Sequence, residues 1–225
     1  MKVTTDACLF GAWTVKEVEN GKWKVENVLD IGTGTGLLAL MFAQKNAESR
    51  IDDIEIDKVA AEQASINVNS SPWKEQINVI NADAKIFLFE KRFDLIISNP
   101  PFYEKEIRSA TDNKNIAHHS EELKLGELLF IIRNNLAAKG NFFLLLPYKR
   151  NEEIRRLLKD NQLHISKILF VRQSVKHDYF RITLKGRLRE QENGETEFDE
   201  MSIWDENQQY TKEFIQLLKD YYLYL

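Results

Sequence analysis

Residues 28–36 read VLDIGTGTG, an apolar strand that runs directly into a turn containing Gly32, Gly34 and Gly36. Residues 37–44 then have the apolar spacing of a helix. Glycine tolerates the tight backbone of a strand-to-helix turn and lets a ligand approach the main chain without a Cβ clash. The stretch therefore predicts one strand–helix unit of an α/β fold, with a ligand at the turn.

The rest of the chain continues this alternation of strands and helices. With the strand at 25–31, the strands of a seven-stranded sheet are predicted at residues 51–56, 77–80, 93–98, 142–146, 165–171 and 179–188. Residues 198–204 could form a further strand. Helical spacing occurs at 58–68, 123–136, 152–159 and 211–222. This pattern predicts a mainly parallel sheet with helices on both faces and an antiparallel C-terminal hairpin.

Length and composition suit a single globular domain. The chain has 225 residues, 43% of them hydrophobic, and a single cysteine, Cys8, which excludes a disulfide framework within one chain. Because no apolar run reaches membrane-spanning length and no signal peptide is evident, a cytoplasmic protein without a membrane is expected. A monomer is the default oligomeric state. The net charge is −4, yet residues 149–189 carry +8, so a nucleic-acid partner stays open beside an ordinary charged surface.

Acidic side chains stand at the ends of successive predicted strands. Asp30 precedes Gly32 by two residues, and an acid there suits a ligand ammonium group, whereas it would repel a pyrophosphate. Glu55 lies about 20 residues beyond the turn, where an acid typically binds ribose hydroxyls. Asp57 is either a helix cap or a weaker contact. Asp83 could accept from an adenine amino group or cap a helix. Together the acids and the glycine turn indicate an amino-acid-bearing nucleotide cofactor.

Residues 93–102, FDLIISNPPF, form the most specific chemical signal. Pro100 and Pro101 end the strand and fix the backbone. That rigidity can direct the side-chain oxygen of Asn99 and the carbonyl of Pro100 toward one planar amine, which has two N–H groups to donate. Phe102 can stack on a planar substrate. The alternative is a plain strand-terminating turn. The pattern predicts alkyl transfer to an sp² amino nitrogen by positioning, without a covalent intermediate.

The cofactor pattern resembles the Rossmann-like class I methyltransferases, and the NPPF motif resembles the N-P-P-[FY] signature of their amino-group branch. The resemblance implies S-adenosyl-L-methionine as the cofactor, bound by Asp30 and the glycine turn, with Glu55 on the ribose and Asp83 on the adenine. No metal is implied, since His118 and His119 are adjacent and unsuited to chelation.

Four stretches resemble the bacterial tRNA1(Val) (adenine-37-N6)-methyltransferase family almost from end to end. They are MKVTTDACLFGAW at 1–13, VLDIGTGTGLLALMFAQ at 28–44, the run from Gln63 to FDLIISNPPF at 93–102, and YTKEFIQLLKDYYL at 210–223. The resemblance implies methylation of adenine N6 in the anticodon loop of a tRNA. It also implies that residues 1–24 cover the cofactor, through Thr5 and Asp6, while residues 25–225 form the core. The other interpretation of Thr5 and Asp6 is a cap for a helix expected at Cys8–Trp13.

RNA contacts are predicted in two places. The long polar stretch 103–122 follows the catalytic turn and is expected to grip the substrate, since loops of this length usually serve a function. The second place is the basic stretch 149–189. The candidate side chains are Tyr103, Lys105, Arg108, His118, Arg155 and Arg156.

Three rival functions remain open. A protein glutamine-N5 methyltransferase and a ribosomal RNA guanine-N2 methyltransferase would share the NPP motif and the cofactor residues. A non-catalytic binding module that retains the fold as a scaffold is the third, although the intact Asp30, Glu55 and Asn99 argue against it.

Overall fold

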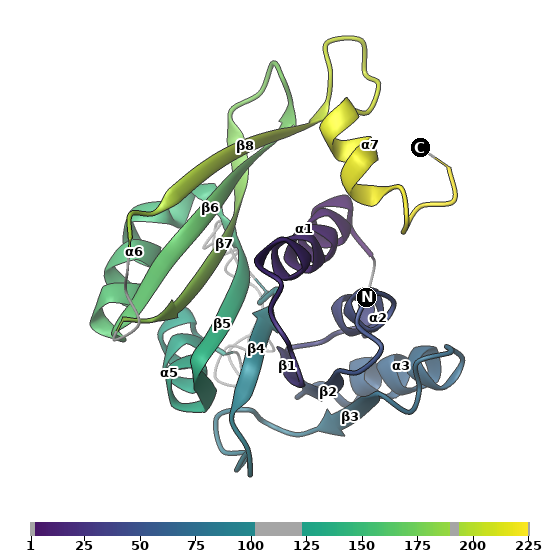
Figure 1. The fold of residues 1–225 in the computed structure, drawn as a ribbon, viewed down its shortest axis with the longest axis vertical. Helices are drawn as coiled ribbons and strands as arrows, with labels where there is room; N and C mark the ends of the chain where they lie inside the picture. Colours follow the sequence, from purple (N-terminus) through teal and green to yellow (C-terminus); the bar gives the residue numbers. More distant parts are fainter. Residues whose placement is uncertain (1–2, 102–122, 190–193, 225) are drawn as a thin grey trace, which may run out of the picture.

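A computed structural model describes residues 3–101, 123–189 and 194–224 (Figure 1). The strands are β1 (Asn27–Ile31), β2 (Arg50–Glu55), β3 (Ile77–Asn81), β4 (Phe93–Ser98), β5 (Leu136–Pro147), β6 (Leu163–Ser174), β7 (Tyr179–Leu188) and β8 (Glu197–Trp204). The helices are α1 (Thr5–Gly21), α2 (Leu37–Ala43), α3 (Lys58–Asn69), α5 (Leu125–Asn135), η1 (Tyr148–Arg150), α6 (Asn151–Asp160) and α7 (Lys212–Leu218).

All the described strands belong to one sheet, in the order β3-β2-β1-β4-β5-β7-β6-β8. Neighbouring strands from β3 to β5 pair in parallel, whereas β7 runs antiparallel to both β5 and β6. The mainly parallel α/β sheet and its antiparallel hairpin are therefore confirmed. The predicted count of seven strands is wrong, because β8 adds an eighth.

β8 pairs in parallel with β6 at the edge of the sheet, with Lys167 opposite Glu197 and Ile168 opposite Phe198. It is largely exposed, and its mixed polar sequence gave only a weak strand signal. Without β8, the 12 residues of β6 would end the sheet as a long edge open to pairing with other chains. The extra strand thus protects an edge that a seven-stranded sheet would leave bare.

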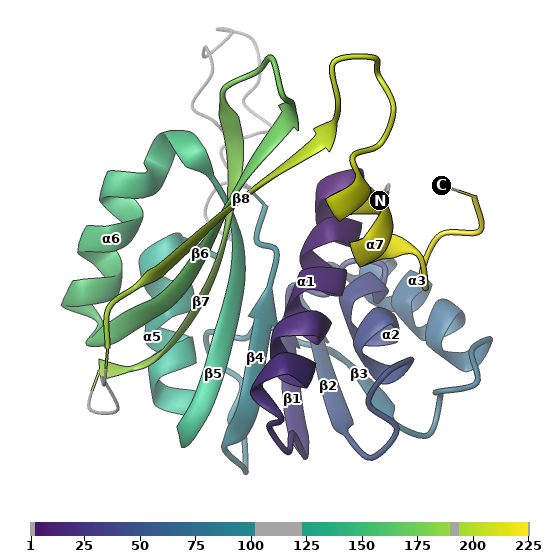
Figure 2. The ribbon, with the colours of Figure 1, turned by 45° about the horizontal axis from the view of Figure 1, so that its top comes forward.

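Helices cover both faces of the sheet, as the pattern predicted (Figures 1 and 2). One hydrophobic core joins the sheet to α1, α2 and α7, and a second joins the opposite face to α5 and α6. Alternation in β5 serves both cores, since Phe143 and Leu145 face the first and Phe142 and Leu144 face the second.

The N-terminal helix is longer than the expected segment at Cys8–Trp13. α1 has 17 residues and buries Phe10 and Trp13 in the first core, where the Trp13 ring meets the Phe143 ring edge to face at 5.5 Å. It packs against α2 and α7. Figure 2 shows its N-terminal end at the same edge of the sheet as the carboxyl ends of β4 and β5.

Candidate active site

The glycine turn between β1 and α2 has the backbone that its sequence predicted. Gly32, Gly34 and Gly36 all have positive φ, of 74°, 60° and 78°. A Cβ at Gly32 would meet nothing within 4 Å, so the space beside it is open to a ligand, whereas one at Gly36 would touch Ala64 of α3 at 3.6 Å. Gly32 therefore suits ligand approach, and Gly36 suits close packing of the turn on α3.

Three hydrogen bonds to two neighbouring elements fix this turn. The Gly32 amide donates to the carbonyl of Ile54 at 2.8 Å, and the Asn67 side chain donates to the carbonyl of Thr35 at 2.8 Å. The Gly34 amide donates to the Glu55 carboxylate at 2.9 Å. The turn is thus held in place by β2 and α3 before any ligand binds.

Asp30 lies at the floor of the site and is fully buried. One carboxyl oxygen lies 2.9 Å from the Thr33 hydroxyl, and the other has no hydrogen-bond partner. Burial, and the negative charge of Glu55, raise the pKa of Asp30 to about 7, although the Thr33 hydrogen bond acts in the opposite direction. An unpartnered buried carboxyl oxygen is what a cationic ligand group would satisfy.

Glu55 ends β2 and is only 7% exposed. Its two oxygens accept from the amides of Gly34 and Asp57, at 2.9 and 3.0 Å. Since a carboxylate offers about four lone-pair sites, Glu55 keeps acceptor capacity for ligand hydroxyls. Asp57 is the N-cap of α3, where it accepts from the Ala60 amide at 2.7 Å, so its predicted cap role is confirmed.

Asp83 follows β3 on the same edge of the sheet. One oxygen accepts from the Lys85 amide at 2.9 Å, and the other lies 3.7 Å from the Lys85 ammonium. The side chain thus caps a turn, which is close to the helix cap that the sequence offered as its other interpretation. It is also 26% exposed and so remains available to a ligand.

The NPP turn lies directly beside the glycine turn. β1 and β4 pair with Asp30 opposite Ile97, and the Ser98 hydroxyl donates to the Ile31 carbonyl at 2.7 Å. Asn99, partly buried, comes next in the chain, followed by Pro100, buried, and Pro101, exposed. The amide and carbonyl of the predicted catalytic pair are therefore positioned at the edge where Gly32 leaves open space.

Thr5 and Asp6 lie in the first turn of α1 and are not its N-cap, because the cap residue is Thr4. The Asp6 carboxylate accepts from the Arg181 guanidinium at 2.8 Å, and Thr5 shares hydrogen bonding with the Tyr222 hydroxyl. The helix-cap interpretation of these two residues is wrong. The contacts link α1 to β7 and to the segment after α7 at the ligand edge of the sheet.

The basic stretch 149–189 does not form one free surface. Lys167 and Lys185 point to α1, where both contact Glu17 at 3.0 and 3.1 Å, while Arg172 pairs with Glu200 of β8 at 3.1 Å. Arg155 and Arg156 are exposed on α6, which covers the other face. Phe102, Tyr103, Lys105, Arg108 and His118 lie outside the described residues.

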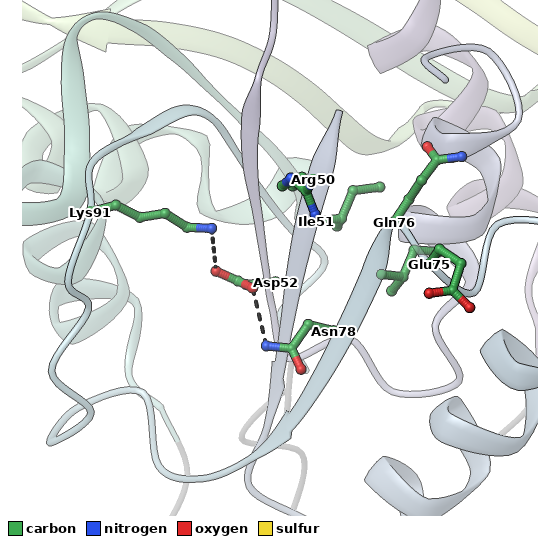
Figure 3. A pocket seen from close by; sticks show the side chains of 8 residues that line it. Arg50, Ile51, Asp52, Glu75, Gln76, Asn78 and Lys91 are labelled. Atoms are coloured by element: carbon green, nitrogen blue, oxygen red, sulfur yellow. Dashed lines mark hydrogen bonds and ion pairs between the residues drawn. The ribbon is translucent and has the colours of Figure 1, made fainter. Parts of the chain in front are cut away.

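A small pocket at the opposite edge of the sheet is unrelated to these residues. It lies at the amino ends of β2 and β3, where Asp52 joins Lys91 at 2.9 Å and Asn78 at 3.2 Å (Figure 3). In the described parts of the chain, no three His, Cys, Asp or Glu side chains converge as a metal site. Likewise, none of the helices described is both long and apolar enough to cross a membrane.

Sequence reasoning missed four residues that shape the site. Thr33, Ser98 and Asn67 hold the two turns, and Asp53 of β2 contacts Thr33 at 3.0 Å. The signal for Asp53 was an acid inside an apolar strand, IDDIE, but only the register shows that it faces Asp30.

Comparison with known proteins agrees with this geometry. Residues 15–150 match the family model of the methyltransferase small domain. The fold resembles a predicted O-methyltransferase from Agrobacterium tumefaciens, with a TM-score of 0.62 at 13% identity over 86% of this chain and 88% of that one. It also resembles the glycopeptide N-methyltransferase MtfA in complex with S-adenosylmethionine, with a TM-score of 0.57 at 11% identity over 79% and 94%. The fold and family define an S-adenosylmethionine-dependent methyltransferase.

Curated relatives narrow the class further. A Haemophilus influenzae protein named tRNA1(Val) (adenine(37)-N6)-methyltransferase is 36% identical over 99% of this chain and 92% of its own length. A Flavobacterium johnsoniae protein of the same name is 34% identical over 99% and 93%. One from Dyadobacter fermentans is 46% identical over 65% of this chain and 59% of its own length. The chain belongs to the tRNA1(Val) (adenine(37)-N6)-methyltransferase family.

Proposed function

We propose that this protein transfers a methyl group from S-adenosyl-L-methionine to N6 of adenine 37 in the anticodon loop of tRNA1(Val). The observation that carries the reaction is the position of Asn99 and Pro100, at the end of β4 and directly beside the glycine turn. The names of relatives aligned over nearly the whole chain support the substrate. We place the activity in the cytoplasm, where tRNA is processed.

The residues at the edge of the sheet fit the cofactor. The unpartnered Asp30 oxygen suits the ammonium of its amino-acid part, and the open space at Gly32 suits its close approach. Glu55 keeps lone pairs for the ribose hydroxyls, and the partly exposed Asp83 is proposed to accept from the amino group of the cofactor's adenine. When bound, the cofactor supplies a methyl group on a sulfonium, which is reactive toward an amine without further activation.

The residues of this chain position the adenine that receives the methyl group. The Asn99 side-chain oxygen and the Pro100 carbonyl each accept one N–H of the adenine amino group, which directs the nitrogen lone pair toward the methyl carbon. With the cofactor bound, the N–C bond would form as the C–S bond breaks, and one N–H proton would then leave to water. Positioning of this kind contributes roughly 7–11 kcal/mol in favourable cases. Phe102 is proposed to stack on the adenine.

An adenine in a loop costs less to extract than a base inside a duplex, because it has no pairing partner to leave and fewer stacked neighbours. We propose that residues 103–122, with Tyr103, Lys105, Arg108 and His118, and the exposed Arg155 and Arg156 contact the RNA. We further propose that residues 1–225 form a single domain. In it, residues 1–24 cover the cofactor site, with Thr5 and Asp6 as the contacts.

The test is methyl transfer from labelled S-adenosylmethionine to tRNA from cells that lack the activity, followed by nucleoside analysis. N6-methyladenosine at position 37 of tRNA1(Val), absent when that adenine is replaced, is the expected result. Label in ribosomal RNA as N2-methylguanosine, or in a protein glutamine, would overturn the substrate and support one of the alternatives, while keeping the NPPF chemistry.

A further inference from the structure

Two acids face each other beneath the glycine turn. Asp30 of β1 and Asp53 of β2 are register partners, and both are 0% exposed. One oxygen of each lies within hydrogen-bond distance of the same hydroxyl, that of Thr33, at 2.9 Å for Asp30 and 3.0 Å for Asp53. The remaining oxygen of each acid has no hydrogen-bond partner. Two buried carboxyl groups therefore share one donor.

A count of hydrogens constrains their charge. A threonine hydroxyl has one hydrogen to donate, and two lone pairs with which to accept. It can donate to only one of the two acids, so the other contact is a hydrogen bond only if that acid donates to Thr33. A carboxylate has no hydrogen to donate. If both contacts are hydrogen bonds, at least one of the two acids is therefore protonated, and the repulsion between two adjacent carboxylates favours the same state.

The surrounding charges favour the same state. Glu55 acts on Asp30, and Asp52 acts on Asp53, and both are acids. Helix α2 has no charged residue in its sequence LLALMFA, and β3 has none in INVIN. On α3, Lys58 and Glu62 are exposed and lie 3.8 Å apart. On β4, Asp94 is engaged with the amides of Glu26 and Asn27 at the far end of the strand.

Asp53 is the stronger candidate for the protonated partner. Burial and the charge of Asp30 raise the pKa of Asp53 well above its ordinary value, while that of Asp30 rises to about 7. Asp30 is also the acid that lies directly before the turn, beside the ligand space. A proton on Asp53 leaves Asp30 free to carry the negative charge.

We propose that Asp53 is a positioning residue that remains a neutral carboxylic acid, donates to Thr33, and so directs the Thr33 hydrogen to Asp30. The order of donation is Asp53 to Thr33 to Asp30. This inference rests on the proposed function in one respect, namely that Asp30 receives the ammonium group of the cofactor. By staying neutral, Asp53 leaves a single negative charge, on Asp30, where two carboxylates would repel each other.

Binding of S-adenosylhomocysteine across a range of pH tests the role of Asp53. Asp53→Ala removes the donor and should weaken binding roughly tenfold, as expected for the removal of one hydrogen bond. Asp53→Asn keeps a neutral donor and should restore the affinity to within about twofold of the natural chain. An Asp53→Asn variant that binds as weakly as Asp53→Ala would overturn the proposal, since the acid would then act through its charge.

Thr33→Val separates positioning from packing. Affinity for S-adenosylhomocysteine should rise with pH as Asp30 ionises. Thr33→Val removes the hydrogen bond that lowers the pKa of Asp30, so this rise should move to higher pH. The loss of affinity relative to the natural chain should therefore shrink under alkaline conditions. A loss of equal size at every pH would mean that Thr33 only packs the turn, which would contradict the relay.

Carbon-13 NMR of the aspartate carboxyl groups in the unliganded protein gives an answer that does not depend on the cofactor. We expect one resonance to keep the shift of a protonated acid at neutral pH, and to vanish in Asp53→Asn. Only ionised aspartates at neutral pH would overturn the proposal. A natural chain that binds no S-adenosylhomocysteine, but retains this resonance, would instead contradict the proposed function and leave the protonated Asp53 standing.

Discussion

Two clusters of buried charge lie on the α1 face of the sheet, and they differ in whether their charges are matched. Under the glycine turn, Asp30 and Asp53 share the Thr33 hydroxyl, and the charges that raise their pKa values are those of neighbouring acids. Between α1 and the β6–β7 hairpin, Glu17 lies between two lysines, Lys167 and Lys185. In the second cluster the charges of opposite sign pair with each other, and the pairs link α1 to the sheet. In the first cluster no cation pairs with the acids among the described residues, which is what a binding site for a cationic ligand requires.

The largest expected effect is at the catalytic turn. Asn99→Ala removes one acceptor for the adenine amino group, and it should slow methyl transfer by roughly 10²–10³-fold, the range for removing one positioned polar group from an active site. Cofactor affinity should stay nearly unchanged, because Asp30 and Glu55 are untouched. Single-turnover transfer at saturating cofactor, with a parallel binding measurement, checks both. A loss of cofactor affinity in this variant would contradict the assignment.

The matched cluster predicts a loss of stability without a loss of binding. Glu17→Gln leaves Lys185 and Lys167 largely buried, at 14% and 16% exposure, although Lys167 retains Asp199 at 2.9 Å. We expect a cost of about 2–3 kcal/mol, below the roughly 3–5 kcal/mol of a fully broken buried pair. Thermal unfolding should shift downward by about 4–12 °C. The control is Glu197→Gln, whose side chain is 75% exposed and should change little. Reduced cofactor binding in Glu17→Gln would erase the contrast between the clusters.

The unmatched cluster predicts a stability that falls as pH rises. The folded protein holds a proton on Asp30 and Asp53 that the unfolded chain releases near pH 4, so this contribution is largest below about pH 4. It is lost progressively as the pH rises through the folded pKa of Asp30, about 7. Urea unfolding at about pH 5 and pH 8 should show a smaller decrease in the Asp30→Asn/Asp53→Asn double variant than in the natural chain. An equal decrease in both proteins would place the titration elsewhere.

The smallest expected effect is on RNA binding by the exposed residues of α6. Arg155→Glu and Arg156→Glu should weaken tRNA binding modestly and flatten its salt dependence, by about one unit of slope for each phosphate that the variant no longer neutralises. The control is Lys139→Glu, an exposed change at the start of β5 on the far edge of the sheet. An unchanged slope would remove α6 from the RNA interface and leave residues 103–122 as the remaining proposed contact.

The sequence predicted the parts of the fold that local pattern determines. Gly32, Gly34 and Gly36 marked the first turn, and Asn99-Pro100-Pro101 ended β4 where expected, because glycine and proline act on their own backbone. The β8 strand was harder, since its first four residues, EFDE, are exposed and lack the apolar alternation of a buried strand. α1 was underestimated because its buried face follows from packing against α2 and α7.

The candidate site also divides into residues that a local sequence pattern reveals and a residue that depends on strand register. Asp30, Glu55 and Asn99 were identified because each stands at a strand end beside a recognisable turn. Asp53 lies inside the predicted strand at 51–56 and was not among the predicted site residues. Its importance depends on the register of β1 against β2, which no local pattern contains. The acids proposed to contact the cofactor were thus easier to find than the acid proposed to support them.

The packing of α1 against α7 has a consequence for the protein's synthesis. The side of α1 that faces α7 meets Phe214 and Leu217, about 200 residues further along the chain. At roughly 5–20 residues per second, a ribosome takes on the order of 10–40 s to make that distance. During this interval the part of the α1 surface that packs against α7 has no native cover. Newly made chains should therefore be at greatest risk of capture by chaperones, or of association with one another, until α7 emerges.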